Sequence, residues 1–185
     1  MARIPLIDGE DLTPEQQRVY DAVVAGPRGV VQGPLRAALH RPELADKWQA
    51  LGELLRYRTS LPPRLSEIAI LVTARRMDCP LEWHFHALAA ATAGLEPEIV
   101  EAIRAGARPQ AEDEALDVHD FAAELLDMKI VSEATYARAR GRWGVTGVVE
   151  LTALVGYYVM VAMTLTNHEI PLPEGVEPPF GPPDA

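Results

Sequence analysis

Hydrophobic residues recur along most of this chain every three or four positions, which is the spacing of a helix that buries one face. The pattern predicts helices over residues 14–25, 34–40, 42–58, 97–106, 111–128, 132–144 and 145–167. Two more helices follow the break at residues 60–63, and the second of them ends near Gly94. Since no run alternates as a strand would, we predict an all-α bundle of about eight or nine helices.

In the helix over residues 42–58, the spacing also predicts which side faces the core. The hydrophobic residues at helical intervals are Leu44, Trp48, Leu51, Leu54 and Leu55. We therefore expect all of them to be core residues.

Residues 26–34, GPRGVVQGP, are rich in glycine and proline and are expected to form a loop. Near a pocket, such a loop can supply backbone N–H groups to a ligand. A simple connection between two helices is an equally open alternative.

Residues 145–167 are apolar nearly all round, and the run is long enough to cross a bilayer. Glu150 interrupts the run, however, and glycine, alanine and threonine dilute it. A central helix that is buried by its neighbours or by other subunits therefore explains the run better than a membrane span.

The chain is most simply divided into one all-α domain over residues 1–170 and a proline-rich arm over residues 171–185. The arm contains too many prolines for a helix or a central strand. We expect it to extend over its own subunit or a neighbouring one.

Composition limits the partners. A formal net charge of −10 disfavours nucleic acid and anionic membranes, which both attract basic surfaces. A small anionic substrate remains possible if a local arginine binds it. The single cysteine excludes an intrachain disulfide, and an acidic turn lies where an export signal would have its apolar core. We therefore expect a cytoplasmic protein.

The central stretch, residues 67–86, has the pattern of two helices that meet at a tight corner. A proline follows Cys79 and suits the first position of the second helix, which makes Cys79 its N-cap. Glu82 and His86 then lie four residues apart on one face. The hairpin brings Glu67 back toward them, so the stretch predicts an acid–base cluster.

Within this cluster, we expect Glu82 to pair with His86. A carboxylate beside an imidazole fixes its tautomer and raises its pKa, which suits a general acid near neutral pH. An ordinary surface pair has the same spacing and is the alternative. Glu67 lies in an apolar stripe, which perturbs the pKa of a carboxyl group, and its alternative is a structural ion pair with an arginine such as Arg75.

Cys79 is the remaining candidate, because a helix N-terminus lowers the pKa of a thiol. A dithiol enzyme needs a second cysteine one turn later, and that position holds Glu82. A small buried residue at a tight corner is the alternative for Cys79. No second helix carries a Glu-x-x-His motif to complete a metal site, so we expect no metal.

Several arginines cluster near the central stretch of an otherwise acidic chain. They are Arg56, Arg58, Arg64, Arg75 and Arg76. Each is suited to bind a substrate carboxylate, and the sequence leaves the choice among them open.

With these residues the chain resembles the carboxymuconolactone decarboxylase family, within the larger AhpD-like group, over most of its length. In AhpD-like peroxidases a glutamate precedes a C-x-x-C-x-x-x-H motif at the spacing that separates Glu67 from Cys79 here. Glu82 replaces the second cysteine, and the peroxidase cycle requires a disulfide between the two cysteines. Residues 82–86, EWHFH, are similar to the decarboxylase-like branch.

The resemblance implies an all-α subunit that assembles as a homo-trimer or homo-hexamer. It also implies a cofactor-free decarboxylase of a small cyclic acid such as 4-carboxymuconolactone, whose conjugated lactone accepts the electrons that CO₂ leaves behind. His86 would be the general acid or the oxyanion donor. Glu82 would orient His86, and Glu67 would relay protons.

Other activities on the same residues stay open. One is a thiol-dependent peroxidase, or another antioxidant oxidoreductase, that uses Cys79 and an external thiol. Another is an isomerisation or a lactone hydrolysis by the same Glu/His pair. A non-catalytic oligomeric binding protein is the last.

Overall fold

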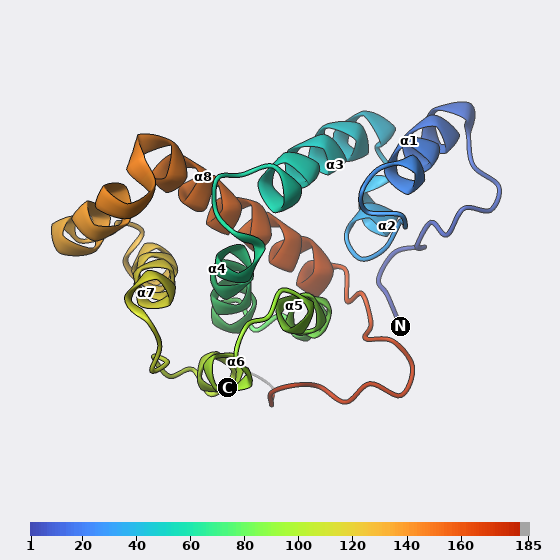
Figure 1. The fold of residues 1–185 in the computed structure, drawn as a ribbon. Coiled ribbons are helices and arrows are strands. Elements are labelled where there is room, and N and C mark those ends of the chain that lie inside the picture. Colours follow the sequence, from blue (N-terminus) through green and yellow to red (C-terminus); the bar gives the residue numbers. More distant parts are fainter. Residues whose placement is uncertain (182–185) are drawn as a thin grey trace.

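A computed structural model describes residues 1–181, which form eight helices and contain no strand (Figure 1). The helices are α1 (Pro14–Ala25), α2 (Leu35–Ala38), α3 (Pro42–Tyr57), α4 (Pro63–Arg76), α5 (Pro80–Thr92), α6 (Pro97–Arg104), α7 (Asp113–Met128) and α8 (Glu133–Asn167). The predicted all-α class is confirmed, and the number of helices lies within the predicted range.

Helix α4 forms the centre of the molecule, where α5, α7 and α8 pack around it (Figure 1). Every residue from position 65 to position 74 is buried. The sequence explains this, because a helix that is apolar nearly all round is stable only inside the protein. Glu67 is thereby held in the core, where a carboxyl group needs a partner.

The corner between α4 and α5 has the predicted form. Cys79 is the N-cap of α5, and its backbone N–H donates to the carbonyl of Ala74 at 2.9 Å. Asp78 has a φ of 44°, in the left-handed region, which allows the chain to reverse within a few residues. The reversal lays α5 beside α4, so Glu67 faces the side chains of α5.

Helix α8 crosses the bundle and bends at Gly144, whose φ of 67° and ψ of −171° are not helical. The predicted boundary near this glycine is therefore confirmed as a kink. By length and composition α8 could cross a membrane, but 50% of its most apolar window is buried in the fold. It packs against α3, α4, α5 and α7, so residues 145–167 form a core helix, as predicted.

Helix α3 buries only two of the five residues predicted to face the core. Trp48 and Leu55 are buried, together with Ala45 and Gly52 on the same side. The other predicted core residues are between 43% and 50% exposed: Leu44, Leu51 and Leu54. The prediction was wrong because small residues let this face approach α8 closely, and small residues do not stand out in a hydrophobic pattern.

The C-terminal arm has no helix over residues 171–181 and lies against its own chain. Phe180 packs edge-on against Trp83, with ring centroids 5.7 Å apart, and the guanidinium of Arg75 lies 5.0 Å from the Phe180 ring. Arg104 donates to the carbonyl of Pro179 at 2.8 Å. The last part of the predicted arm, residues 182–185, lies outside the described residues.

Candidate active site

A cavity of about 120 Å³ lies between the loop before α2 and helices α3, α5 and α8. Its polar lining residues are Arg28, Gln32, Arg56, Glu82, His86, Tyr157 and Tyr158. Apolar side chains complete the wall, among them Phe85, Val161 and Leu165. A small, partly apolar cavity with a few convergent polar groups is the usual form of a small-molecule site.

Glu67 and His86 form a buried pair that joins α4 to α5. Glu67 Oε2 lies 2.7 Å from His86 Nδ1, and both side chains are at most 10% exposed. Burial lowers the pKa of His86, and the nearby Glu67 carboxylate opposes this effect only in part. A neutral His86 therefore donates its Nδ1–H to Glu67, which leaves the Nε2 lone pair as an acceptor.

Glu82 does not pair with His86, so the predicted pair is wrong. The two residues lie on one face of α5, but the imidazole is turned toward Glu67 in α4. Neither carboxyl oxygen of Glu82 has a hydrogen-bond partner among the described residues, and the side chain is only 2% exposed. Burial raises the pKa of Glu82 well above its ordinary value, so Glu82 is a neutral acid that lines the cavity.

Two arginines supply the positive charge of the cavity. Arg56 was among the predicted candidates, whereas Arg28, from the loop before α2, was not. Arg28 donates to the hydroxyl of Tyr157 at 3.4 Å, and the Nε groups of both arginines are buried without a hydrogen-bond partner in the described part of the chain. The loop over residues 26–34 thus lines the cavity and is more than a simple connection between two helices. It contributes the guanidinium of Arg28.

The other candidate arginines are engaged elsewhere. Their ion pairs are Arg58 with Glu53, Arg64 with Glu96, Arg75 with Asp78 and Arg76 with Asp127. The alternative partner of Glu67, Arg75, is therefore excluded. Of the five candidates, Arg56 is the one that lines the cavity.

Two tyrosines of α8 complete the site, and the sequence pattern did not reveal them because they lie inside the apolar run. Tyr158 packs its ring edge-on against His86, with centroids 4.8 Å apart. Tyr157 packs in the same way against Tyr158, at 5.3 Å. Burial raises the pKa of both phenols, so they remain neutral and can donate their O–H groups.

Cys79 does not line the cavity. Its side chain is 1% exposed, and burial, with a smaller contribution from the nearby Glu82 carboxyl group, raises the pKa of the thiol to about 11. The expected lowering by the helix N-terminus is thus outweighed by desolvation. The structure favours the alternative that we gave for Cys79, a small buried residue at a tight corner.

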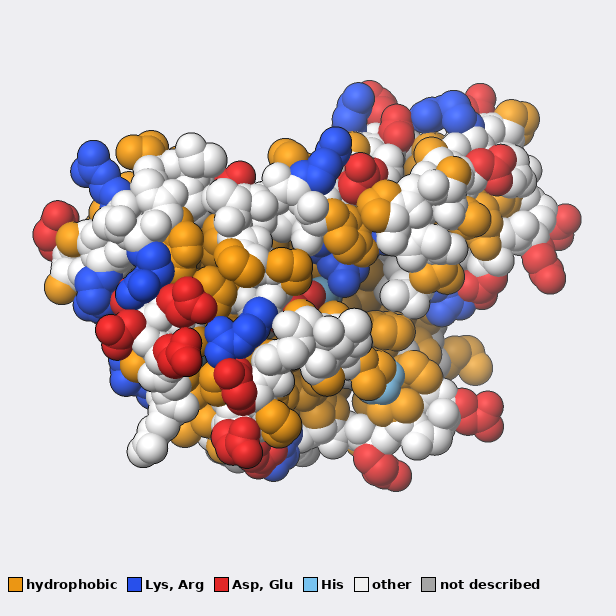
Figure 2. Space-filling view, in the orientation of Figure 1, with side chains coloured by type: hydrophobic (Ala, Val, Ile, Leu, Met, Phe, Trp, Pro, Cys, Tyr) orange, Lys and Arg blue, Asp and Glu red, His pale blue; other side chains and the backbone are white. Residues whose placement is uncertain are grey.

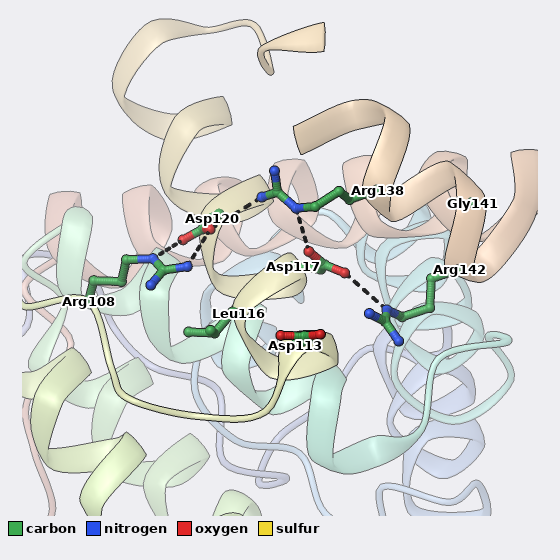
Figure 3. Close-up of a pocket in the computed structure, with 8 residues that line it drawn as sticks. All are labelled: Arg108, Asp113, Leu116, Asp117, Asp120, Arg138, Gly141 and Arg142. Atoms are coloured by element: carbon green, nitrogen blue, oxygen red, sulfur yellow. Dashed lines mark hydrogen bonds and ion pairs between the residues drawn. The ribbon is translucent and has the colours of Figure 1, made fainter. Parts of the chain in front are cut away.

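A second hollow, of about 640 Å³, lies between α7 and the first part of α8, and Figure 3 shows its charged lining. Asp117 accepts from Arg138 at 2.7 Å and from Arg142 at 3.0 Å, and Asp120 accepts from Arg108 at 2.8 Å. These ion pairs join α7 to α8, and among the residues drawn Asp113 is the acidic side chain that has no dashed line in Figure 3. Over residues 1–181, no group of three His, Cys, Asp or Glu side chains is placed to hold a metal ion.

Comparison with known proteins agrees with this arrangement at the level of family and fold. The sequence pattern of the Carboxymuconolactone decarboxylase family (CMD) matches residues 42–124, which include α4 and α5. No curated protein matches the chain at a significant level.

Several solved structures share the fold. An uncharacterised peroxidase-related protein from Ralstonia eutropha JMP134, described as an alkylhydroperoxidase AhpD core, has a TM-score of 0.77 at 13% identity, with 94% of this chain and 93% of that chain covered. A peroxidase-related protein from Silicibacter sp. TM1040 has a TM-score of 0.74 at 17% identity, with coverages of 91% and 90%. The debrominase Bmp8, in a cysteine-to-alanine variant bound to 2,3,4-tribromopyrrole, has a TM-score of 0.73 at 11% identity, with 94% of each chain covered. These similarities establish an AhpD-like fold.

Proposed function

We propose that this protein is a cofactor-free carboxy-lyase, because the sequence pattern of the carboxymuconolactone decarboxylase family matches residues 42–124. Its substrate is a small cyclic carboxylic acid such as 4-carboxymuconolactone. One observation carries the proposal: a single small cavity brings together two arginines, a neutral carboxylic acid and an imidazole held by a carboxylate.

The charges of the cavity support an anionic substrate. Arg28 and Arg56 are permanently charged, while Glu82 and His86 are neutral because of burial. Two guanidinium groups thus face one buried carboxylate, that of Glu67. An acid that enters the cavity would restore the balance and would satisfy the unpartnered Nε groups of the arginines.

In the proposed reaction the bond between the γ carbon and the carboxylate breaks and CO₂ leaves. The electron pair spreads through the conjugated ring onto the carbonyl oxygen of the lactone. Arg28, Arg56 or the phenol of Tyr158 stabilises the resulting dienolate there. Glu82 then gives its proton to a carbon atom of the dienolate. His86 returns a proton to Glu82 from solvent, and Glu67 holds the imidazole in place during the transfer. This scheme assigns the acid role to Glu82, where the sequence had indicated His86.

A peroxidase that depends on Cys79 is the alternative that the fold neighbours suggest. The surroundings of the thiol argue against it. A nucleophilic cysteine needs access to its substrate and a lowered pKa, whereas Cys79 is buried and its pKa is raised to about 11. We therefore prefer the lyase.

The test is turnover of 4-carboxymuconolactone by purified protein, followed by ultraviolet absorbance and by CO₂ release. The wild type should consume the lactone, and Glu82→Gln and His86→Ala should each lose about 10²- to 10⁴-fold in kcat. Arg56→Ala should chiefly raise KM. Cys79→Ala is the control and should keep its activity.

Two results would contradict the proposal in different ways. No turnover by the wild type would exclude this lactone as substrate. Turnover that disappears in Cys79→Ala but survives in Glu82→Gln would exclude the acid–base mechanism and would favour thiol chemistry.

A further inference from the structure

We propose that the same cavity also catalyses a 1,3-proton shift in small butenolide acids that carry hydrogen, in place of a carboxylate, at the γ carbon. This second activity, an isomerisation without loss of CO₂, rests on the proposed function insofar as both use this cavity. His86 removes the γ proton, and Glu82 delivers a proton to the α carbon. The conjugated lactone is thereby converted to its non-conjugated isomer, or the reverse.

The base of this reaction is Nε2 of His86. The hydrogen bond of 2.7 Å to Glu67 fixes the proton of the neutral ring on Nδ1 and leaves the Nε2 lone pair free. The same bond prepares the ring for its charged form, because the Glu67 carboxylate stabilises an imidazolium once Nε2 has taken a proton. His86 lines the cavity, so a bound ring can present a C–H bond to it.

The acid is the carboxyl group of Glu82. Neither oxygen of this buried carboxyl group has a partner among residues 1–181, and a ligand in the cavity would offset the cost of burying it. It lines the cavity that His86 lines. Burial raises the pKa of Glu82 and lowers the pKa of His86. Two titratable groups whose pKa values are shifted in opposite directions are typical of the acid and the base of a proton-transfer enzyme.

Their placement on one helix decides the geometry of the shift. Glu82 and His86 are four residues apart in α5, which places them side by side on one helix face. The proton is therefore removed and delivered on the same face of the ring. The guanidinium groups of Arg28 and Arg56 bind the carboxylate side chain and the developing oxyanion.

The steps balance without a cofactor. The bond between the γ carbon and its hydrogen breaks, and the proton goes to Nε2. The electron pair forms the β–γ double bond while the α–β double bond shifts its pair to the α carbon, by way of the dienolate. The α carbon takes the proton of Glu82. The imidazolium then gives its proton to solvent and the Glu82 carboxylate takes a proton from solvent, which restores both groups and brings solvent deuterium into the product in D₂O. The dienolate is of the kind that CO₂ loss produces, so one set of donors stabilises both reactions.

The experiment follows 5-oxo-2,5-dihydrofuran-2-acetate in D₂O by proton NMR, with and without full-length protein. The wild type should speed deuterium incorporation at the α and γ carbons by about 100-fold or more over buffer. Glu82→Gln and His86→Gln should each return the rate close to that of buffer. His119→Gln is the matched control, because His119 is also buried beside a carboxylate but does not line the cavity.

Exchange no faster than in buffer, or exchange that Glu82→Gln leaves unchanged, would overturn the inference. This failure is distinguishable from failure of the lyase, since the two assays use different lactones and different signals. CO₂ release without deuterium incorporation would leave the lyase in place and exclude the isomerisation. Deuterium incorporation without CO₂ release would leave the isomerisation in place and exclude the lyase.

Discussion

At the scale of single residues, Glu82 carries an energetic cost that the rest of the site does not remove. Its neutral form is tolerated in the cavity, whereas its ionised form would lie buried without a partner. The unfolded chain ionises the same group freely above its ordinary value of 4.5. Between that value and the raised pKa of the folded state, the folded protein binds more protons than the unfolded one, so stability falls as the pH rises.

Glu82→Gln should therefore stabilise the protein at neutral pH. The amide has nearly the same shape and cannot ionise, so its advantage should be absent near pH 4.5 and should grow by up to about 1.4 kcal/mol per pH unit above it. Urea unfolding of both proteins at several pH values measures this difference. Parallel curves for the variant and the wild type would mean that Glu82 ionises normally in the folded state.

Cys79 should be chemically inert in the folded protein. With a pKa of about 11 and 1% exposure, the thiol has little thiolate at pH 8 and little access to reagents. Iodoacetamide should label it only on the timescale of unfolding, whereas the urea-unfolded chain should react at the rate of an ordinary thiol. Rapid labelling under native conditions would revive a role for this cysteine in catalysis.

The sequence predicted which residues of the central stretch meet, but not how they pair. Spacing within one helix placed Glu82 and His86 on the same face correctly. The rotation of the imidazole toward Glu67 depends on how α4 and α5 pack, and a pattern along the chain does not contain that information. Arg28 and Tyr158 were missed for the same reason, since they reach the cavity only through long-range packing.

At the scale of elements, the contact between α3 and α8 depends on the absence of a side chain. A Cβ atom at Gly52 would meet the hydroxyl of Tyr157 and the guanidinium of Arg28, and it would lie 2.7 Å from Tyr157 Cζ. Gly52 thus allows Tyr157 and Arg28 to pack against the backbone of α3 while both line the cavity. Helix α3 therefore shapes the site in two ways, through this close approach and through Arg56, which lines the cavity.

Gly52→Ala should displace Arg28 or Tyr157 and raise KM by about tenfold or more, because a small misplacement of a binding group is costly. Overpacking should also lower the free energy of unfolding by about 1–3 kcal/mol. Steady-state kinetics and urea unfolding measure the two effects. Gly141→Ala is the control, since a Cβ there meets nothing within 4 Å and should stabilise α8 by about 0.5–1 kcal/mol. Unchanged KM in Gly52→Ala would exclude the positioning role.

Most helices could be predicted because proline, glycine and capping residues mark their ends locally. At the start of α1, Thr13 and Gln16 form a capping box, which a threonine three residues before a glutamine favours. In α8, the non-helical Gly144 marks the kink. The orientation of α3 could not be predicted in this way. Trp48 and Leu55 are buried as the pattern predicts, but three leucines of α3 are exposed while Ala45 and Gly52 are buried.

At the scale of the whole molecule, α8 also leaves an uncharged stripe on the surface. Its exposed members are Val145, Val149, Thr152, Gly156, Met160 and Met163. In Figure 2 hydrophobic side chains lie over the middle of the face, where Figure 1 places α8, and charged side chains lie beside them and along the edges. We propose that a second copy of this chain covers the stripe, because two molecules of net charge −10 meet with least repulsion where neither carries charge.

This proposal predicts an oligomer that charge on the stripe disrupts. Val149→Glu combined with Met163→Glu should dissociate the assembly, which gel filtration with light scattering detects as a fall in mass to that of one subunit. Ile130→Glu is the control, because this residue is 71% exposed but lies outside α8. A monomeric wild type would exclude the proposal, and so would a double variant of unchanged mass.

The kink at Gly144 divides α8 into two segments that differ in how firmly they are held. Before the kink, Thr135 and Ala139 are the buried residues, and much of the attachment to α7 comes from the ion pairs of Arg138 and Arg142. Beyond the kink, residues 147–165 contribute many core side chains. Local opening follows burial, so the first segment can detach while the second stays in place. The residues of α8 that line the cavity all lie beyond this kink, in the more deeply buried segment.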